Sequence, residues 1–397
     1  MIYPEFLKDN ATIGICAPSA GVGHKIESFE KSLNVLRQQG WRVWETEHVR
    51  VDSLRGGTAK ERAAELMSLF VQSHVDAVFA AAGGDFLSEM LPYIDWQILA
   101  ENPKWLMGAS DPTGILYPLT TMCDIATLYG SNGGSFDSVV KQSEDSHLTS
   151  AEGTSHLTSP DDSSHFASSD GTSHLTSPDD SSHIASPDGC RLHEADVLPG
   201  PGEALVTPEY LRNMLRILKG DLPVQQTSTC YISNDIFQLE DGILTFPSPT
   251  VYRSSCETLH ARGRCIGGCI DVLKDLIGTC FDYTSDFIHR YHEDGLIWYF
   301  DNFALSSAVL YRTLLQMRYA GWITPETTQA VLIGRTLFEN EESDMTYDDA
   351  VCMAVPDIPV IWNMDIGHTA PHFSMINGAM LDVSWNGKTA QLWFELS

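Results

Sequence analysis

Strand patterns and helix patterns alternate through the first 136 residues, and this alternation restricts the fold of the chain more than any other feature. The apolar strand patterns lie at 11–17, 41–44, 75–82, 105–109 and 125–129. An amphipathic helix pattern and a capping-box start at Thr58 stand between them. Strands that are separated by helices predict an α/β domain with a parallel sheet.

The composition changes between residues 137 and 206. From Ser146 to Cys190 the chain repeats a nine-residue unit five times, with one histidine in each unit, at 147, 156, 165, 174 and 183. These units are rich in Ser, Asp, Gly and Pro, so they cannot bury enough apolar surface to offset the entropy of ordering. We therefore expect a disordered insertion, and removing 143–200 should leave folding intact. Weak metal capture by the spaced imidazoles and carboxylates is the alternative.

Regular patterns resume at Thr207-Pro208, where a cap residue precedes a proline at the first position of a helix. A strand pattern at 296–300, a helix pattern at 306–319 and several short β runs follow. They predict a second domain of mixed α/β character that is rich in strands. The expected organisation is an N-terminal domain over 1–136, an insertion over 137–206 and a C-terminal domain over 207–397.

The charge balance restricts the partners of the chain. Acidic residues outnumber basic ones by 53 to 24, which argues against a nucleic-acid groove. The first residues lack a secretory pattern and no apolar run is long enough to span a bilayer, so we expect a cytoplasmic protein without a membrane partner. The nine cysteines lie in apolar surroundings and are expected to be reduced. Cys265 and Cys269 lack the second pair that a zinc site needs.

A serine follows the strand pattern at 105–109. The run from Pro103 to Thr113 reads PKWLMGASDPT, so Ser110 stands on a sharp turn between a strand and a Pro-started segment. A serine in this position can act as a nucleophile, with backbone N–H groups of the turn as an oxyanion hole. However, the run lacks the second glycine of the usual nucleophile elbow. Ser110 or Asp111 is alternatively the N-cap of the next helix.

Two residues far downstream could complete a catalytic triad. Asp301 ends the apolar strand pattern at 296–300, and His368 lies in a glycine-bearing loop after the strand pattern at 359–362. A nucleophilic serine needs a base to take its proton and a carboxylate to orient that base. From the pattern alone, Asp301 can equally close a strand and His368 can be an ordinary loop histidine.

Six motifs in order resemble the LD-carboxypeptidase family, which includes muramoyltetrapeptide carboxypeptidases and microcin C self-immunity hydrolases. The motifs are Ala17-Pro18-Ser19, Gly83-Gly84, the 103–113 run, Gly267-Gly268-Cys269-Ile270, Gly334-Arg335 and Gly367-His368-Thr369-Ala370-Pro371. The resemblance covers residues 1–136 and 207–397. It implies a serine peptidase with a Ser-Glu-His triad, a Rossmann-like N-terminal domain, no metal or other cofactor, and a homodimer.

The resemblance also assigns roles to single residues. It places Ser110 and His368 at the nucleophile and base positions, and the backbone N–H groups of Gly84 and Asp111 in the oxyanion hole. The family's acid is a glutamate, and Asp301 occupies its position, one methylene shorter. An impaired triad is one alternative. Another is Glu240, which lies in a Leu-Glu-Asp run like that of the family's acid but precedes the Gly267-Gly268 motif.

These roles imply a serine carboxypeptidase that hydrolyses an L,D-peptide bond and releases a terminal D-alanine from murein tetrapeptides during cell-wall recycling. Its partner would be a small peptide substrate. An immunity hydrolase that cleaves a peptide–nucleotide antibiotic would use the same residues. A non-catalytic binding protein is the third hypothesis. A sequence that is no longer constrained by catalysis would tolerate both the Glu-to-Asp change and the long insertion.

Overall fold

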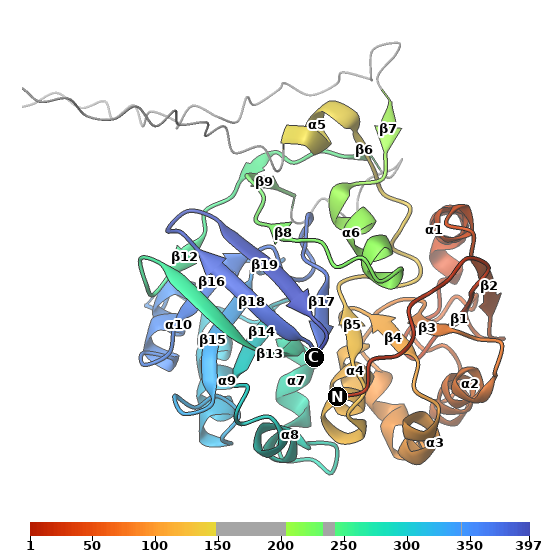
Figure 1. The fold of residues 1–397 in the computed structure, drawn as a ribbon, viewed down its shortest axis with the longest axis horizontal. Helices are drawn as coiled ribbons and strands as arrows, with labels where there is room; N and C mark the ends of the chain where they lie inside the picture. Colours follow the sequence, from red (N-terminus) through yellow and green to blue (C-terminus); the bar gives the residue numbers. More distant parts are fainter. Residues whose placement is uncertain (148–203, 233–242, 343) are drawn as a thin grey trace, which may run out of the picture.

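Two large β-sheets lie side by side in the computed structural model, and helices flank each of them; two small sheets, of three and two short strands, accompany them among the described residues (Figure 1). The structure describes residues 1–147, 204–232, 243–342 and 344–397. The described chain is therefore an α/β protein with a mostly parallel N-terminal sheet and a mixed C-terminal sheet, as the sequence predicts.

The N-terminal sheet has the order β17-β5-β4-β3-β1-β2. Its strands are β1 (Thr12–Cys16), β2 (Arg42–Glu45), β3 (Ala77–Ala80), β4 (Trp105–Gly108), β5 (Thr127–Tyr129) and β17 (Met375–Asn377). The first five are parallel, whereas β17 pairs antiparallel with β5. Strands β1, β3 and β4 are buried along their whole length, because helices cover both faces of a parallel sheet.

The helical segments of this half are η1 (Gly23–Lys25), α1 (Ile26–Gln38), α2 (Ala59–Val71), η2 (Leu87–Tyr93), α3 (Trp96–Glu101) and α4 (Thr113–Cys123). Helix α2 begins with the predicted capping box, in which Thr58 and Glu61 bond to each other's backbone N–H groups. The predicted alternation of strand and helix is thus confirmed.

The C-terminal sheet has the order β12-β16-β15-β14-β13-β18-β19-β8. Its strands are β8 (Gln225–Gln226), β12 (Arg253–Ser254), β13 (Leu259–Cys269), β14 (Leu296–Asp301), β15 (Thr328–Gly334), β16 (Val360–Met364), β18 (Met380–Trp385) and β19 (Ala390–Glu395). Strands β13 to β16 are parallel, and the other pairs are antiparallel. Its helices are α7 (Ile270–Leu276), α8 (Thr284–Arg290), α9 (Ser307–Tyr319) and α10 (Tyr347–Ala354).

Several short elements lie between the two halves in the sequence. They are β6 (Val139–Lys141), α5 (Gln142–His147), β7 (Leu205–Val206), α6 (Glu209–Leu218), β9 (Cys230–Tyr231), β10 (Ile243–Leu244) and β11 (Ser248–Pro249). Helix α6 lies against the N-terminal half, where Leu7 N–H donates to Leu218 O at 2.8 Å. The repeats predicted to be disordered lie almost wholly outside the described residues, and the proposed domain limits at 136 and 206 stay a prediction.

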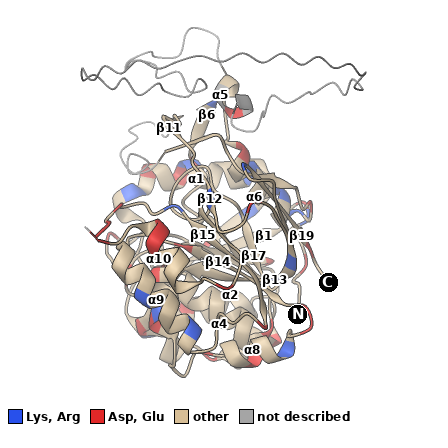
Figure 2. Cartoon of the chain, turned by 90° about the vertical axis from the view of Figure 1, so that its left-hand side faces the viewer, with Lys and Arg blue, Asp and Glu red and all other residues tan. Residues whose placement is uncertain are grey.

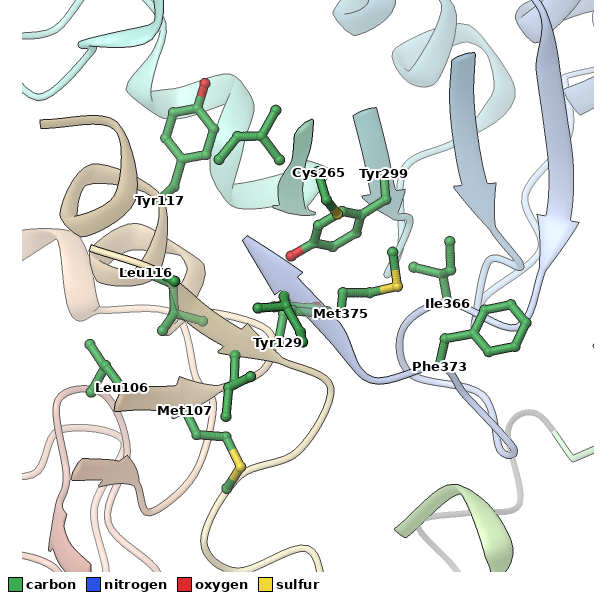
Figure 3. Packing of buried hydrophobic residues seen from close by; sticks show 14 of the residues in the cluster. Leu106, Met107, Leu116, Tyr117, Tyr129, Cys265, Tyr299, Ile366, Phe373 and Met375 are labelled. Carbon is green, nitrogen blue, oxygen red and sulfur yellow. The ribbon is translucent and has the colours of Figure 1, made fainter. Parts of the chain in front are cut away.

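Aromatic packing joins the two sheets into one core. Tyr117 of α4 stacks on Trp322 with ring centroids 5.2 Å apart, and Trp322 stacks on Trp298 of β14 at 5.7 Å. Figure 3 shows the same seam, with Tyr129 and Met375 between the two sheets. All of these residues belong to a single buried hydrophobic cluster. The relative position of the two sheets is therefore set by buried packing.

Three further observations concern the acidic surface, the length of the helices and the cysteines. Acidic residues gather at α10, whose first turn carries Asp348 and Asp349 (Figure 2). Within the described ranges, every helix is too short or too polar to cross a bilayer. Seven described cysteines are free thiols, whereas Cys230 is disulfide-bonded, so the expectation of reduced cysteines is wrong at that residue.

Replacing residues 148–203 by a short Gly/Ser linker should leave the fold intact. The ends of the described chain meet there, because Gln142 N–H donates to Ala204 O at 3.1 Å and Lys141 pairs with Leu205. We expect the melting temperature in a thermal scan to change by less than about 4 °C, which corresponds to ~1 kcal/mol.

A wider deletion of residues 139–206 is the control. It also removes Asp145, whose carboxylate accepts the Glu209 N–H at 2.9 Å and pairs with Arg212 at 2.7 Å at the start of α6. This deletion should lower the melting temperature further. Equal, large losses in both variants would contradict the prediction.

Candidate active site

Ser110 lies on a strained turn between β4 and α4. Its φ of 69° lies in the left-handed region, which residues other than glycine rarely adopt. The turn is tight on both sides: a Cβ on Gly108 would lie 2.5 Å from Pro112 Cβ, and one on Gly83 would lie 2.9 Å from Ser110 Cβ. A strained serine at a strand-to-helix turn is typical of a nucleophile elbow.

The alternative that Ser110 or Asp111 caps α4 is wrong. The N-cap residue of α4 is Pro112, and no side chain caps the helix there. The carboxylate of Asp111 turns instead to Ser19 and Leu87: it accepts the Ser19 hydroxyl in a short hydrogen bond and the Leu87 N–H at 2.9 Å. Burial raises the pKa of Asp111, which these two hydrogen bonds oppose.

Two backbone N–H groups near this turn are available to a ligand. Neither Gly84 N–H nor Asp111 N–H donates a hydrogen bond to another residue within the described ranges. Gly84 has φ +152°, and a Cβ there would lie 2.3 Å from Ser19 Oγ. Ser19 therefore contacts both segments that carry these N–H groups, and it explains why position 84 requires glycine.

Asp301 and His368 lie in direct contact. Asp301 ends β14 and is wholly buried, and His368 Nδ1 lies 2.8 Å from its Oδ2 and 3.1 Å from its Oδ1. The His368 side chain is 13% exposed and packs on the Phe303 ring, with centroids 4.5 Å apart. Burial opposes protonation of His368, but the charge of Asp301 and the hydrogen bond to it raise the His368 pKa above its usual value.

The structure brings two of the three predicted triad residues into hydrogen-bond contact. Within the described ranges, Ser110 and His368 form no hydrogen bond. Hydrogen bonds to a nucleophile are often long in the ligand-free state and tighten on binding. Glu240, the alternative acid, lies outside the described residues.

Two residues of this site were missed by the sequence analysis. Tyr129, at the end of β5, donates its hydroxyl to Asp301 in a short hydrogen bond and accepts the N–H of Ser110 at 3.2 Å. Asp271 of α7 accepts the N–H groups of Phe303 and Ala304 at 3.0 and 3.2 Å and so holds the loop after Asp301. The only sequence signals were that Tyr129 ends a predicted strand and that Asp271 follows the second Gly-Gly motif.

A pocket open to solvent, with an empty volume of about 1090 Å³, lies next to Asp301 at the carboxyl ends of β15 and β16. Asn302 lines it and is only 2% exposed. Arg335 also lines it, pairs with Asp365 in a short contact and lies 4.4 Å from the Tyr231 ring centroid. Ligands of open α/β sheets bind at the carboxyl ends of parallel strands, which is where this pocket lies.

Comparison with known proteins agrees with this geometry. The LD-carboxypeptidase N-terminal domain matches residues 13–130, and the LD-carboxypeptidase C-terminal domain matches residues 262–383. A putative carboxypeptidase of Vibrio cholerae is 30% identical over 132 residues, which are 33% of this chain and 40% of that protein. The microcin C7 self-immunity protein of Escherichia coli is 29% identical over 121 residues, 30% of this chain and 35% of its own.

Solved structures share the fold over nearly the whole chain. The ligand-free wild-type microcin C7 self-immunity protein superimposes with a TM-score of 0.70 and 17% identity, over 100% of this chain and 99% of its own. The muramoyltetrapeptide carboxypeptidase of Oxalobacter formigenes does so with a TM-score of 0.62 and 14% identity, over 97% and 98%. The aligned sequences span less than half of the curated relatives, but both domains of one family match in order. The chain belongs to the LD-carboxypeptidase family.

Proposed function

We propose that this protein is a serine carboxypeptidase that hydrolyses an L,D-peptide bond. In this proposal Ser110 is the nucleophile, His368 the general base and Asp301 the residue that orients the base. The observation that carries it is the partly buried hydrogen bond from His368 Nδ1 to the wholly buried Asp301, together with a serine held at φ 69°. A Ser-His-Asp arrangement of this kind supports acyl transfer on unrelated folds.

The proposed reaction begins with a proton transfer. Because His368 Nδ1 faces Asp301, its Nδ1–H donates to the carboxylate and its Nε2 is left to accept the hydroxyl proton of Ser110. The serine oxygen then attacks the carbonyl carbon, and the resulting imidazolium gives its proton to the leaving amine. In the second half, His368 takes a proton from water and the water oxygen attacks the acyl carbon. The bond to Ser110 Oγ then breaks, Oγ takes the proton back from His368, and the acid is released.

The negative charge of the tetrahedral intermediate needs donors that are already in place. The N–H groups of Gly84 and Asp111 fit this role, since neither bonds to another residue of the described chain. Such donors do not need to break an existing bond when the oxyanion forms. The Ser110 N–H is excluded because it already donates to Tyr129.

The proposed substrate is a murein tetrapeptide from which a terminal D-alanine is released, in cell-wall recycling in the cytoplasm. The support is the family and the named muramoyltetrapeptide carboxypeptidase that shares the fold. As in the family, we propose a homodimer that needs no cofactor. A second candidate is cleavage of a peptide–nucleotide antibiotic, favoured by the 29% identity to the microcin C7 self-immunity protein.

Gly367 keeps the acid and the base in contact. A Cβ at this position would lie 1.8 Å from Asp301 Oδ1, and Gly367 has φ +103°. Any larger residue would therefore displace Asp301 or move the loop that carries His368. The close approach supports the assignment of Asp301 as the residue that orients His368.

Replacing Ser110 by alanine should abolish D-alanine release from a murein tetrapeptide, and Asp301→Asn should reduce kcat about 10³- to 10⁴-fold because the amide favours the wrong imidazole tautomer. Release is measured with a coupled D-amino-acid oxidase assay. Ser68→Ala, on the exposed face of α2, is the control and should keep full activity.

The outcomes separate the hypotheses. Full activity of Ser110→Ala would disprove the nucleophile assignment. Release of an amino acid from the antibiotic but not from the tetrapeptide would favour the immunity hydrolase. Hydrolysis of neither, together with no reaction of Ser110 with a fluorophosphonate, would favour the non-catalytic binding protein.

The pH profile of kcat/KM should have an acidic limb whose midpoint lies above about 6.5, the ordinary pKa of histidine. His368 must be neutral to act as base, and the charge of Asp301 raises its pKa, so activity is lost as the pH falls through that raised value. Measuring kcat/KM from pH 5 to 9 tests this. A midpoint below 6.5 would mean that another group limits the rate.

Gly367→Ala should lower both stability and activity, whereas Gly321→Ala should affect stability alone. Gly321 has φ +78° with nothing within 4 Å of a Cβ, so its replacement costs only the backbone strain of about 1–2 kcal/mol. Gly367→Ala adds the collision with Asp301 and should reduce kcat at least tenfold. Urea denaturation and the release assay check this, and equal kcat values for both variants would contradict it.

A further inference from the structure

The hydroxyl of Tyr129 is a buried polar group that has no part in the reaction proposed above. Tyr129 ends β5 and is 1% exposed. Its oxygen accepts the N–H of Ser110 at 3.2 Å and its O–H donates to Asp301 Oδ2 in a short hydrogen bond. A single atom therefore contacts both the nucleophile turn and the carboxylate, which are 191 residues apart in the chain (301 − 110).

We propose that Tyr129 is a positioning residue, which fixes the nucleophile Ser110 relative to the acid Asp301 through its hydroxyl. The inference rests on the proposed function, because it assigns a role within the same triad. Tyr129 acts through the other residues and does not itself touch the reacting atoms.

The direction of both hydrogen bonds follows from the chemistry of the groups. A backbone N–H can only donate, so the phenol oxygen accepts from Ser110, and its own hydrogen is left for Asp301. Burial raises the pKa of Tyr129 well above its usual value, so the phenol keeps this hydrogen at neutral pH. Asp301 thus receives one donor from Tyr129 and one from His368, and the two donors fix its orientation.

Tyr129 is itself held on rigid elements. It pairs with Met375 across β5 and β17, and its ring lies 5.7 Å from that of Tyr299 on β14. Figure 3 shows Tyr129 at the seam of the two sheets, close to Tyr299 and Met375. Because strands from both sheets fix the phenol, its oxygen can serve as a reference point for the serine and the acid.

Tyr129→Phe keeps the ring and removes only the hydroxyl, so it tests the role directly. We expect kcat for D-alanine release, and the rate of Ser110 labelling by a fluorophosphonate, to fall roughly 10- to 100-fold, as for loss of one hydrogen bond to a charged group. KM should change less than about threefold. Tyr117→Phe is the matched control. Tyr117 is also wholly buried, and its hydroxyl lies 2.6 Å from Thr284 Oγ1, outside the triad.

The pH profile separates positioning from a structural role. Without the phenol donor, the charge of Asp301 acts more strongly on His368, so the acidic limb should move to higher pH in Tyr129→Phe and stay unchanged in Tyr117→Phe. The charged and titratable groups that face His368 are Asp301, Asp271 and His372. Those that face Tyr129 are Asp301 and Cys269.

A second variant keeps the test valid if Tyr129→Phe does not fold. Fluorotyrosine at position 129 preserves the hydroxyl and lowers the phenol pKa, which makes it a stronger donor to Asp301. The acidic limb should then move to lower pH, and fluorotyrosine at position 117 should have no such effect.

The outcomes distinguish this inference from the proposed function. A folded Tyr129→Phe protein with wild-type kcat, labelling rate and pH profile would overturn the inference alone, as would an unchanged limb in the fluorotyrosine protein. If the wild-type protein neither reacts with the fluorophosphonate at Ser110 nor releases D-alanine, the proposed function fails and the inference fails with it.

Discussion

The carboxylate of Asp301 is the group on which the geometry of the candidate site depends. It is wholly buried, and a buried charge is costly unless it is paired and hydrogen-bonded. Its donors come from distant parts of the chain: Tyr129 belongs to the N-terminal sheet and His368 to a loop near the C-terminus. Satisfying one carboxylate therefore requires that both sheets and this loop are in place together.

The same contact bears on the proposal that Asp301 takes the position at which a glutamate is expected from the family resemblance. A shorter acid must approach the imidazole more closely, and the structure allows this because Gly367 leaves no side chain between them. Phe303 limits the other side of the imidazole through its ring contact with His368. Asp271 holds the backbone of Phe303 in turn, so the loop after β14 is fixed by its own hydrogen bonds.

The parts of the fold that follow from local patterns were predictable, and the parts that depend on distant contacts were not. Hydrophobic periodicity, the capping box at Thr58 and the glycine turns predicted the strands and helices of the first 136 residues. Local pattern left Ser110 and Asp111 open to a capping role, which the structure excludes because Pro112 is the N-cap residue of α4 and no side chain caps the helix there. Asp301 and His368 were assigned through resemblance. The hydrogen bond of Tyr129 could not be predicted, because its partner Asp301 lies 172 residues away.

The loop of His368 also links the two sheets. It leaves β16 in the C-terminal sheet and ends at β17, which adds to the edge of the N-terminal sheet beside β5. Asp365 O accepts the N–H of Phe373 at 2.7 Å, so the loop is closed at its base. Met375 of β17 pairs with Tyr129 of β5. The backbone pairing that anchors one end of the loop therefore also fixes Tyr129, whose phenol bonds Asp301. The proposed base, the proposed acid and the turn of Ser110 thus share one set of backbone contacts. The seam between the sheets can therefore hold the proposed triad although its members are far apart in sequence.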